Sequence, residues 1–135
     1  RYAYLLTPKG FTEKSKLAYQ HLSYFNNLFT VVRQDYLKLF KELKEQGHQQ
    51  VVFCGFDEVA EIAYLSLIEA GLELVAVLDD VSEGKDFFGM TVLPVSECPL
   101  GAQPVVLTSL KKSVELRATL AKYEVPLVRV FLLNG

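Results

Sequence analysis

The sequence predicts an α/β fold in which a small parallel sheet is flanked by helices, preceded by a long N-terminal helix and a short strand. Short, continuously apolar runs at 51–54 and 74–78 are typical of strands buried on both faces. Helical segments separate these runs, and the alternation of strand and helix favours parallel pairing through right-handed crossovers. Half of the 135 residues are apolar, which suffices for one core.

Residues 2–7 are β-prone and stop at Pro8-Lys9-Gly10, a turn signal. An unpaired strand edge is unfavourable, so this strand should pair with another subunit or with a segment outside the given sequence. The sequence starts at Arg1 and not at methionine, and we expect a further segment upstream. The sequence thus divides into three predicted parts: an N-terminal segment with the short strand (1–11), a long helix (12–47) and an α/β domain (48–135).

The apolar pattern of residues 12–47 predicts a long helix through which two copies of the chain dimerise. Apolar residues recur at alternating intervals of four and three, which is the spacing of a heptad seam. The seam consists of Ala18, Leu22, Phe25, Phe29, Val32, Tyr36, Leu39 and Leu43. A single helix would be about 50 Å long, more than the rest of the chain can cover, so a homodimer is expected. The alternative is two shorter helices broken near Asn26-Asn27 or at 30–32.

The remaining elements alternate along residues 48–135. We expect strands at 51–54, 74–78, 104–107 and 127–132, helices at 58–70 and 111–123, a polar loop at 81–89 and a short extended piece at 90–93.

In open α/β sheets, ligands bind beyond the carboxyl ends of the strands, where the strand order reverses. Gly55, Asp79-Asp80 and Thr108-Ser109 leave three successive strands and are therefore candidate ligand contacts. Asp79 lies 24 residues after Gly55, where a Rossmann domain places the carboxylate that binds a ribose hydroxyl. The same residues also suit ordinary turns and helix caps.

The turn after the first strand partly fits the dinucleotide pattern G-x-G-x-x-G/A. Gly55 and Ala60 match its first and third positions, but Asp57 replaces the second glycine and would repel phosphate. Two interpretations remain open: a nucleotide-type pocket, or a degenerate turn kept for structure. The complete candidate ligand-binding set is Gly55, Phe56, Asp57, Glu58, Val59, Asp79, Asp80, Thr108 and Ser109.

Catalytic motifs are not found in the sequence, so we expect no enzyme activity. Neither His21 nor His48 accompanies a serine or cysteine nucleophile, and there is no Walker A motif or metal-ligand spacing. Cys54 and Cys98 are interpreted as reduced packing residues.

Charge is divided unevenly along the chain. Residues 1–50 carry eight basic and four acidic side chains, against six and twelve in residues 51–135. Two interpretations are open, a nucleic-acid partner nearby and a solvated lysine-rich helix, and we favour the solvated helix. No apolar run is long enough to span a membrane and no signal peptide is found, so a cytoplasmic location is expected.

Residues 51–60, 75–80 and 88–93 together resemble small Rossmann-like domains that bind coenzyme A or nucleotide sugars. Such domains form the N-terminal parts of bacterial sugar acyltransferases and polysaccharide-biosynthesis dehydratases. The resemblance covers about residues 50–132 and implies that Gly55, Asp57 and Asp79 face a nucleotide-sugar, NAD-like or CoA-like ligand.

Residues 4–10, followed by the lysine-rich helix, resemble the wing and post-wing helix of winged-helix regulators of the MarR type linked to exopolysaccharide genes. The two resemblances together imply the sensor and dimerisation part of a bacterial transcriptional regulator, binding its effector without catalysis. DNA would be contacted only by a missing upstream domain. The alternatives are a non-catalytic fragment of a nucleotide-sugar-modifying enzyme, and an oligomerisation module with a vestigial pocket.

Overall fold

A computed structural model describes residues 13–109 and 112–132 of the chain. It contains two compact units, residues 1–31 and residues 32–135, and each is described by itself. The predicted strand at 2–7 lies outside the described residues, so its pairing stays a prediction.

Helix α1 (Glu13–Glu45) is one continuous helix of 33 residues. The predicted alternative of a break near Asn26-Asn27 or at 30–32 is therefore wrong, since helical backbone runs through both places. Neither α1 nor any other helix in the described part of the chain has an apolar stretch of the length that a bilayer crossing requires.

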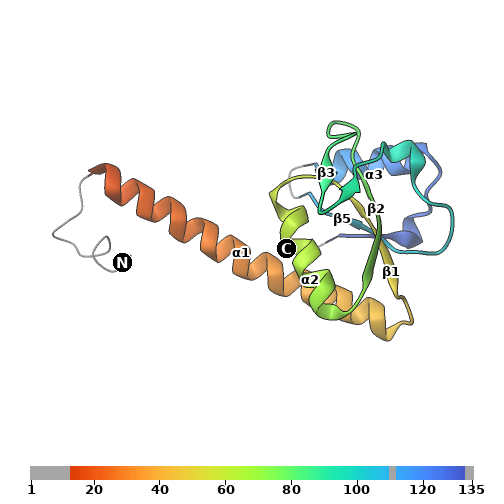
Figure 1. Ribbon diagram of the computed structural model, residues 1–135, viewed down its shortest axis with the longest axis horizontal. Helices are drawn as coiled ribbons and strands as arrows, with labels where there is room; N and C mark the ends of the chain where they lie inside the picture. Colours follow the sequence, from red (N-terminus) through yellow and green to blue (C-terminus); the bar gives the residue numbers. More distant parts are fainter. Residues whose placement is uncertain (1–12, 110–111, 133–135) are drawn as a thin grey trace. The chain divides into compact units, whose positions relative to one another are not determined.

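The second unit is built on a four-stranded parallel sheet, which confirms the predicted α/β class and is consistent with a small Rossmann-like fold (Figure 1). Its strands are β1 (Gln50–Cys54), β2 (Glu73–Leu78), β5 (Val105–Leu107) and β6 (Val130–Phe131). The spatial order is β2-β1-β5-β6. The chain thus leaves β1 toward one side and returns to pair β5 on the other, so the switch point lies between β1 and β5.

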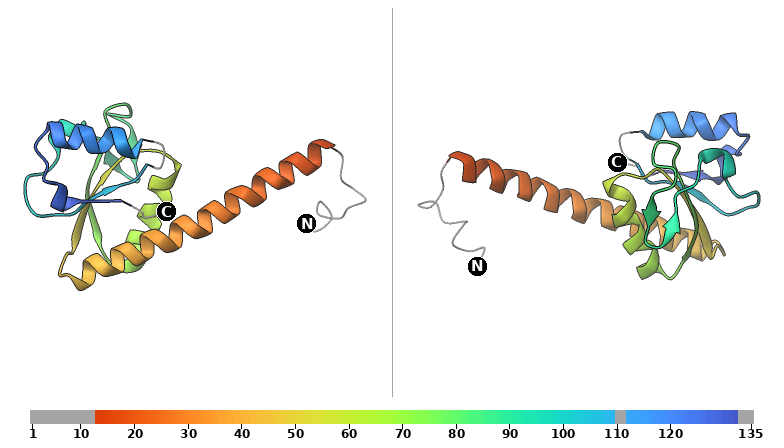
Figure 2. Two further views of the ribbon diagram at one scale, coloured as in Figure 1. Left: turned by 180° about the vertical axis from the view of Figure 1, so that it is seen from behind. Right: turned by 45° about the horizontal axis from the view of Figure 1, so that its top comes forward.

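Helices cover both faces of this sheet because its strands are apolar on both faces (Figures 1 and 2). Helix α2 (Glu58–Ala70) and the last turns of α1 lie on one face, where Phe53 stacks on Phe40 of α1. Helix α3 (Ser113–Lys122) lies on the other, where Leu116 and Leu120 join a core with Val52 and Leu107.

The C-terminal part of α1 belongs to the core of the second unit. Three residues of the predicted seam, Val32, Tyr36 and Leu43, are buried, as is Phe40 beside the seam, all with exposed fractions of 4% or less, whereas Leu39 of the seam is half-buried. The heptad spacing of this stretch therefore serves packing on the chain's own sheet. A partner helix is not needed to explain it.

Two predicted segments differ from the structure. The loop at 81–89 and the extended piece at 90–93 contain an antiparallel hairpin, β3 (Asp86–Phe87) and β4 (Met90–Thr91), followed by a single parallel bridge from Leu93 to Leu78. Positive φ at both Phe88 and Gly89 is the geometry of a two-residue hairpin turn. Strands of two residues are too short to give a periodic signal.

The predicted strand at 127–132 is also shorter than expected. A 3-10 turn, η4 (Leu127–Arg129), precedes β6, and a similar turn, η3 (Val95–Glu97), follows the bridge at Leu93. The buried Arg129 explains the irregular start, because its guanidinium donates to the carbonyls of Gln103 (2.9 Å) and Pro99 (3.1 Å).

Candidate functional site

The chain bends sharply at Gly55, directly after β1. Its φ of +121° lies in a region that side chains with a Cβ rarely adopt. A Cβ at this position would lie 2.9 Å from Ser109 Cβ and 3.0 Å from Ser109 N. The glycine therefore lets the loop after β5 approach the turn after β1, and the predicted bend is present.

Two hydrogen bonds join the carboxyl ends of β1 and β5. Thr108 Oγ1 donates to the carbonyl of Gly55 at 2.7 Å, and Ser109 Oγ donates to Asp57 Oδ2 at 2.7 Å. We call this pair the β1–β5 latch. Thr108 is completely buried and Ser109 is 5% exposed, so the latch closes the strand ends against each other at the switch point.

Asp57 holds two structural contacts at once. As the N-cap of α2 it accepts a hydrogen bond from Val59 N through Oδ1 (3.0 Å), while Oδ2 accepts from Ser109. Capping of this kind satisfies one of the free N–H groups of a helix start. Ser109 Oγ in turn accepts from Lys112 N at 3.2 Å, which connects the latch to the start of α3.

Asp79 and Asp80 lie at the end of β2 and contact the segments that follow them. Asp79 is 5% exposed, and its Oδ2 accepts from Ser82 N at 2.9 Å. Asp80 Oδ1 accepts from Val95 N at 2.8 Å, at the start of η3. Both carboxylates thus stabilise the polypeptide that leaves β2.

The other predicted site residues have different surroundings. Phe56 packs edge-on against Phe87 of the hairpin, with ring centroids 5.7 Å apart. Glu58 is exposed in the first turn of α2, and Val59 is buried. The structure therefore brings Gly55, Asp57, Thr108 and Ser109 into direct contact, whereas the side chains of Phe56, Asp79 and Asp80 contact other segments.

Tyr36 of α1 reaches the same strand end and was missed by sequence reasoning. Its hydroxyl donates to the carbonyl of Leu107 at 2.9 Å, one residue before Thr108. Burial, and then the charge of Asp57, raise the pKa of Tyr36 above its ordinary value, so the hydroxyl stays a donor. The seam contained this tyrosine, but its spacing identified only a packing face.

The two cysteines have the chemistry of packing residues. Both thiols are free, and burial, followed by smaller effects of Cys98, Asp79 and Asp80, raises the pKa of Cys54 to about 12. The pKa of Cys98 is also raised by burial, against an opposing effect of Arg129. Neither is an activated nucleophile at neutral pH. The described residues hold no group of three side chains suited to a metal ion.

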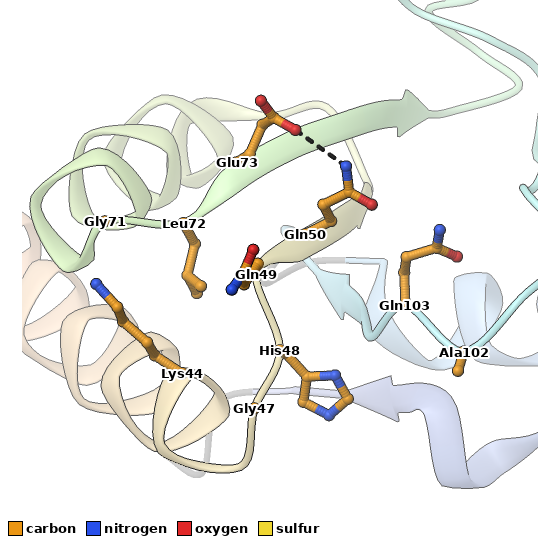
Figure 3. Close-up of a pocket in the computed structure, with 10 residues that line it drawn as sticks. All are labelled: Lys44, Gly47, His48, Gln49, Gln50, Gly71, Leu72, Glu73, Ala102 and Gln103. Atoms are coloured by element: carbon orange, nitrogen blue, oxygen red, sulfur yellow. Dashed lines mark hydrogen bonds between the residues drawn. The ribbon is translucent and has the colours of Figure 1, made fainter.

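A hollow of about 860 Å³ lies at the opposite, amino edge of the sheet (Figure 3). It is lined by Lys44, Gly47, His48, Gln49, Gln50, Gly71, Leu72, Glu73, Ala102 and Gln103. Lys44 Nζ donates to the carbonyl of Ala70 at the end of α2 (3.2 Å), and Gln50 Nε2 donates to Glu73 Oε1 (3.0 Å). Most of these side chains are exposed, so the hollow is an open polar surface.

The fold and the strand-end geometry define a small Rossmann-like α/β domain with a closed switch point. Comparisons with protein families, with curated proteins and with solved structures find no match to this chain.

Proposed function

We propose that this chain is the effector-binding part of a bacterial transcriptional regulator and that it has no catalytic role. The effector is a nucleotide sugar or a similar nucleotide-type metabolite, bound by residues 55–59 after β1, next to the switch point between β1 and β5, and by Asp79 after the neighbouring strand β2. Homodimerisation through α1 belongs to the same proposal and would use the helix before Val32, because the later seam residues Val32, Tyr36 and Leu43 are buried within the chain itself.

The observation that carries the proposal is the path from the latch to α1. Tyr36 donates to Leu107, the next residue Thr108 donates to Gly55, and Ser109 donates to Asp57. A ligand that replaces the Ser109–Asp57 contact would shift the end of β5, to which α1 is hydrogen-bonded. A ligand acts on a helix in this way when it binds one arrangement more tightly than the other.

The same contacts favour a second candidate, an oligomerisation module with a vestigial pocket. Asp57 and Ser109 already satisfy each other, so no ligand is needed to complete their hydrogen bonds. The two candidates differ in one measurable respect, which is whether a nucleotide-type molecule stabilises the folded chain.

The test is thermal unfolding of the chain with UDP-glucose, NAD⁺ and coenzyme A as probes. We expect one probe to raise the midpoint and Asp79→Asn to remove that effect. Asp86→Asn is the control: its carboxylate also accepts from the backbone N–H three residues later, but at an exposed position of the hairpin. With the bound probe, hydrogen exchange in residues 32–45 should change in the native chain and remain unchanged in Tyr36→Phe. Stabilisation by none of the probes would favour the vestigial module.

A further inference from the structure

The outer face of α2 is apolar although it is exposed. Leu65 and Ile68 are 48% and 55% exposed and lie one turn apart on the helix. Tyr64 lies beside them and stacks on Phe88 of the β3–β4 hairpin, with ring centroids 4.4 Å apart. We call these four residues the α2 outer face. Clusters of exposed apolar side chains on one surface mark interaction sites more often than scattered ones do.

Phe88 contributes to this face although its backbone conformation is unfavourable. Its φ is +50°, in the left-handed region where bulky side chains are rare, and its side chain is 52% exposed. A glycine or asparagine would suit the turn better. The aromatic ring is therefore not explained by the turn, and its contact with Tyr64 extends the apolar surface from the helix to the hairpin.

Negative charge borders the α2 outer face. Helix α2 carries Glu58, Glu61 and Glu69 and has no lysine or arginine. Glu69 pairs with Arg33 of α1, and Asp86 of the hairpin is next to the exposed Lys85. Glu58 and Glu61, in contrast, are exposed on α2, with Glu61 one helical turn before Leu65. An apolar strip with an acidic border is complementary to an apolar strip with a basic border.

We propose that the α2 outer face docks a basic amphipathic helix of a partner protein. Apolar side chains of that helix, spaced at i, i+3, i+4 and i+7, would pack on Leu65, Ile68 and Phe88. Its lysines and arginines would lie opposite the exposed carboxylates. A symmetric contact with the same face of a second copy would place like charges together, and an anionic membrane surface would be repelled. This proposal is independent of the effector site.

The test is binding of two labelled peptides of about 18 residues, roughly five helical turns, to the chain. The first has a leucine stripe and lysines on its polar face; its twin has glutamate at every lysine. We expect the basic peptide to bind with an affinity that falls as salt rises, and its twin to bind at least about tenfold more weakly. Fluorescence anisotropy measures both.

Variants of the chain identify the surface. Leu65→Ser and Ile68→Ser should each weaken the basic peptide about tenfold or more, because each removes a large aliphatic contact. Val114→Ser and Val128→Ser, 80% and 83% exposed at other sites, are the matched controls and should bind like the native chain. All four sites are exposed, and unchanged thermal midpoints would verify that the fold is kept.

Four results would overturn the proposal. The first is that neither peptide binds at about 1 mM. The second is equal binding of the two peptides, and the third is binding of the basic peptide that Ile68→Ser leaves intact. The fourth is self-association of the chain in sedimentation velocity that Ile68→Ser abolishes, which would assign the face to a second copy.

Discussion

The two edges of the central sheet differ in how their residues use hydrogen bonds. At the carboxyl edge, the side chains of Thr108, Ser109 and Asp57 bond to one another or to the backbone across two strand ends. At the amino edge, an open hollow is lined by exposed polar side chains, of which Gln50 and Glu73 pair at the surface (Figure 3).

The hollow thus lies at the edge whose polar side chains mostly face water, and the predicted ligand site lies at the edge whose polar side chains bond to one another. The amino edge is hollow because loops from several segments end there and leave space between polar side chains. The carboxyl edge is closed because its polar groups satisfy each other, and there a ligand would have to replace existing hydrogen bonds. Substitutions should therefore be costly at the carboxyl edge and cheap at the amino edge.

The largest expected effect is that of Gly55→Ala at the carboxyl edge. The new Cβ would meet Ser109 at 2.9 Å in a backbone conformation that alanine disfavours. We expect the free energy of unfolding to fall by about 3 kcal/mol. Gly47→Ala at the amino edge is the matched control: its φ is +97° but no atom lies within 4 Å of the new Cβ, so about 1 kcal/mol is expected. Equal losses in urea unfolding would contradict the comparison.

Tyr36→Phe should have the next largest effect. It removes the donor to the buried carbonyl of Leu107 without changing the shape of the side chain. An unsatisfied buried carbonyl costs about 1–3 kcal/mol, and urea unfolding should show a loss in that range. Tyr123→Phe, at a side chain that is 41% exposed, is the control and should leave the midpoint unchanged. If Tyr36→Phe left the free energy of unfolding unchanged, the hydrogen bond between α1 and the end of β5 would not contribute to stability.

Thr108→Val tests the latch itself, with an expected loss of about 1–2 kcal/mol. The variant keeps the shape of the side chain and removes the hydrogen bond to the Gly55 carbonyl. Thr119→Val also removes a threonine bond to a backbone carbonyl, that of Glu115, but on an exposed helix surface. Chemical denaturation should show a loss of about 0.5 kcal/mol or less for this control. Equal stability of Thr108→Val and Thr119→Val would contradict a structural role for the β1–β5 latch.

The smallest effect is expected for Lys44→Met at the amino edge. Lys44 Nζ bonds to the Ala70 carbonyl, but the side chain is exposed, so water can replace it. A loss of about 0.5 kcal/mol or less in thermal unfolding is expected. Lys41→Met, at another exposed position of α1, is the control. A loss above 1 kcal/mol, relative to Lys41→Met, would show that this edge is more tightly built than its exposure indicates.

Much of the fold and part of the geometry of the candidate site could be predicted from local patterns. The buried strand at 51–54 followed by Gly55 predicted the bend, because a continuous apolar run ending in glycine marks a strand that turns at its end. The N-cap Asp57 and the C-cap Gly71 of α2 are residue types that helix ends favour, which is why the predicted helix at 58–70 has the observed bounds. The β3–β4 hairpin was missed because its strands are two residues long.

The sequence by itself determined the order and type of the main elements, since apolar periodicity and end residues are local properties. Only the tertiary structure decided what the later part of the α1 seam contacts, because a sheet and a partner helix both satisfy the same spacing. The pairing of Ser109 with Asp57, and of Tyr36 with Leu107, was likewise decided in three dimensions. These residues are 52 and 71 positions apart, and no local pattern specifies which distant polar groups will satisfy each other.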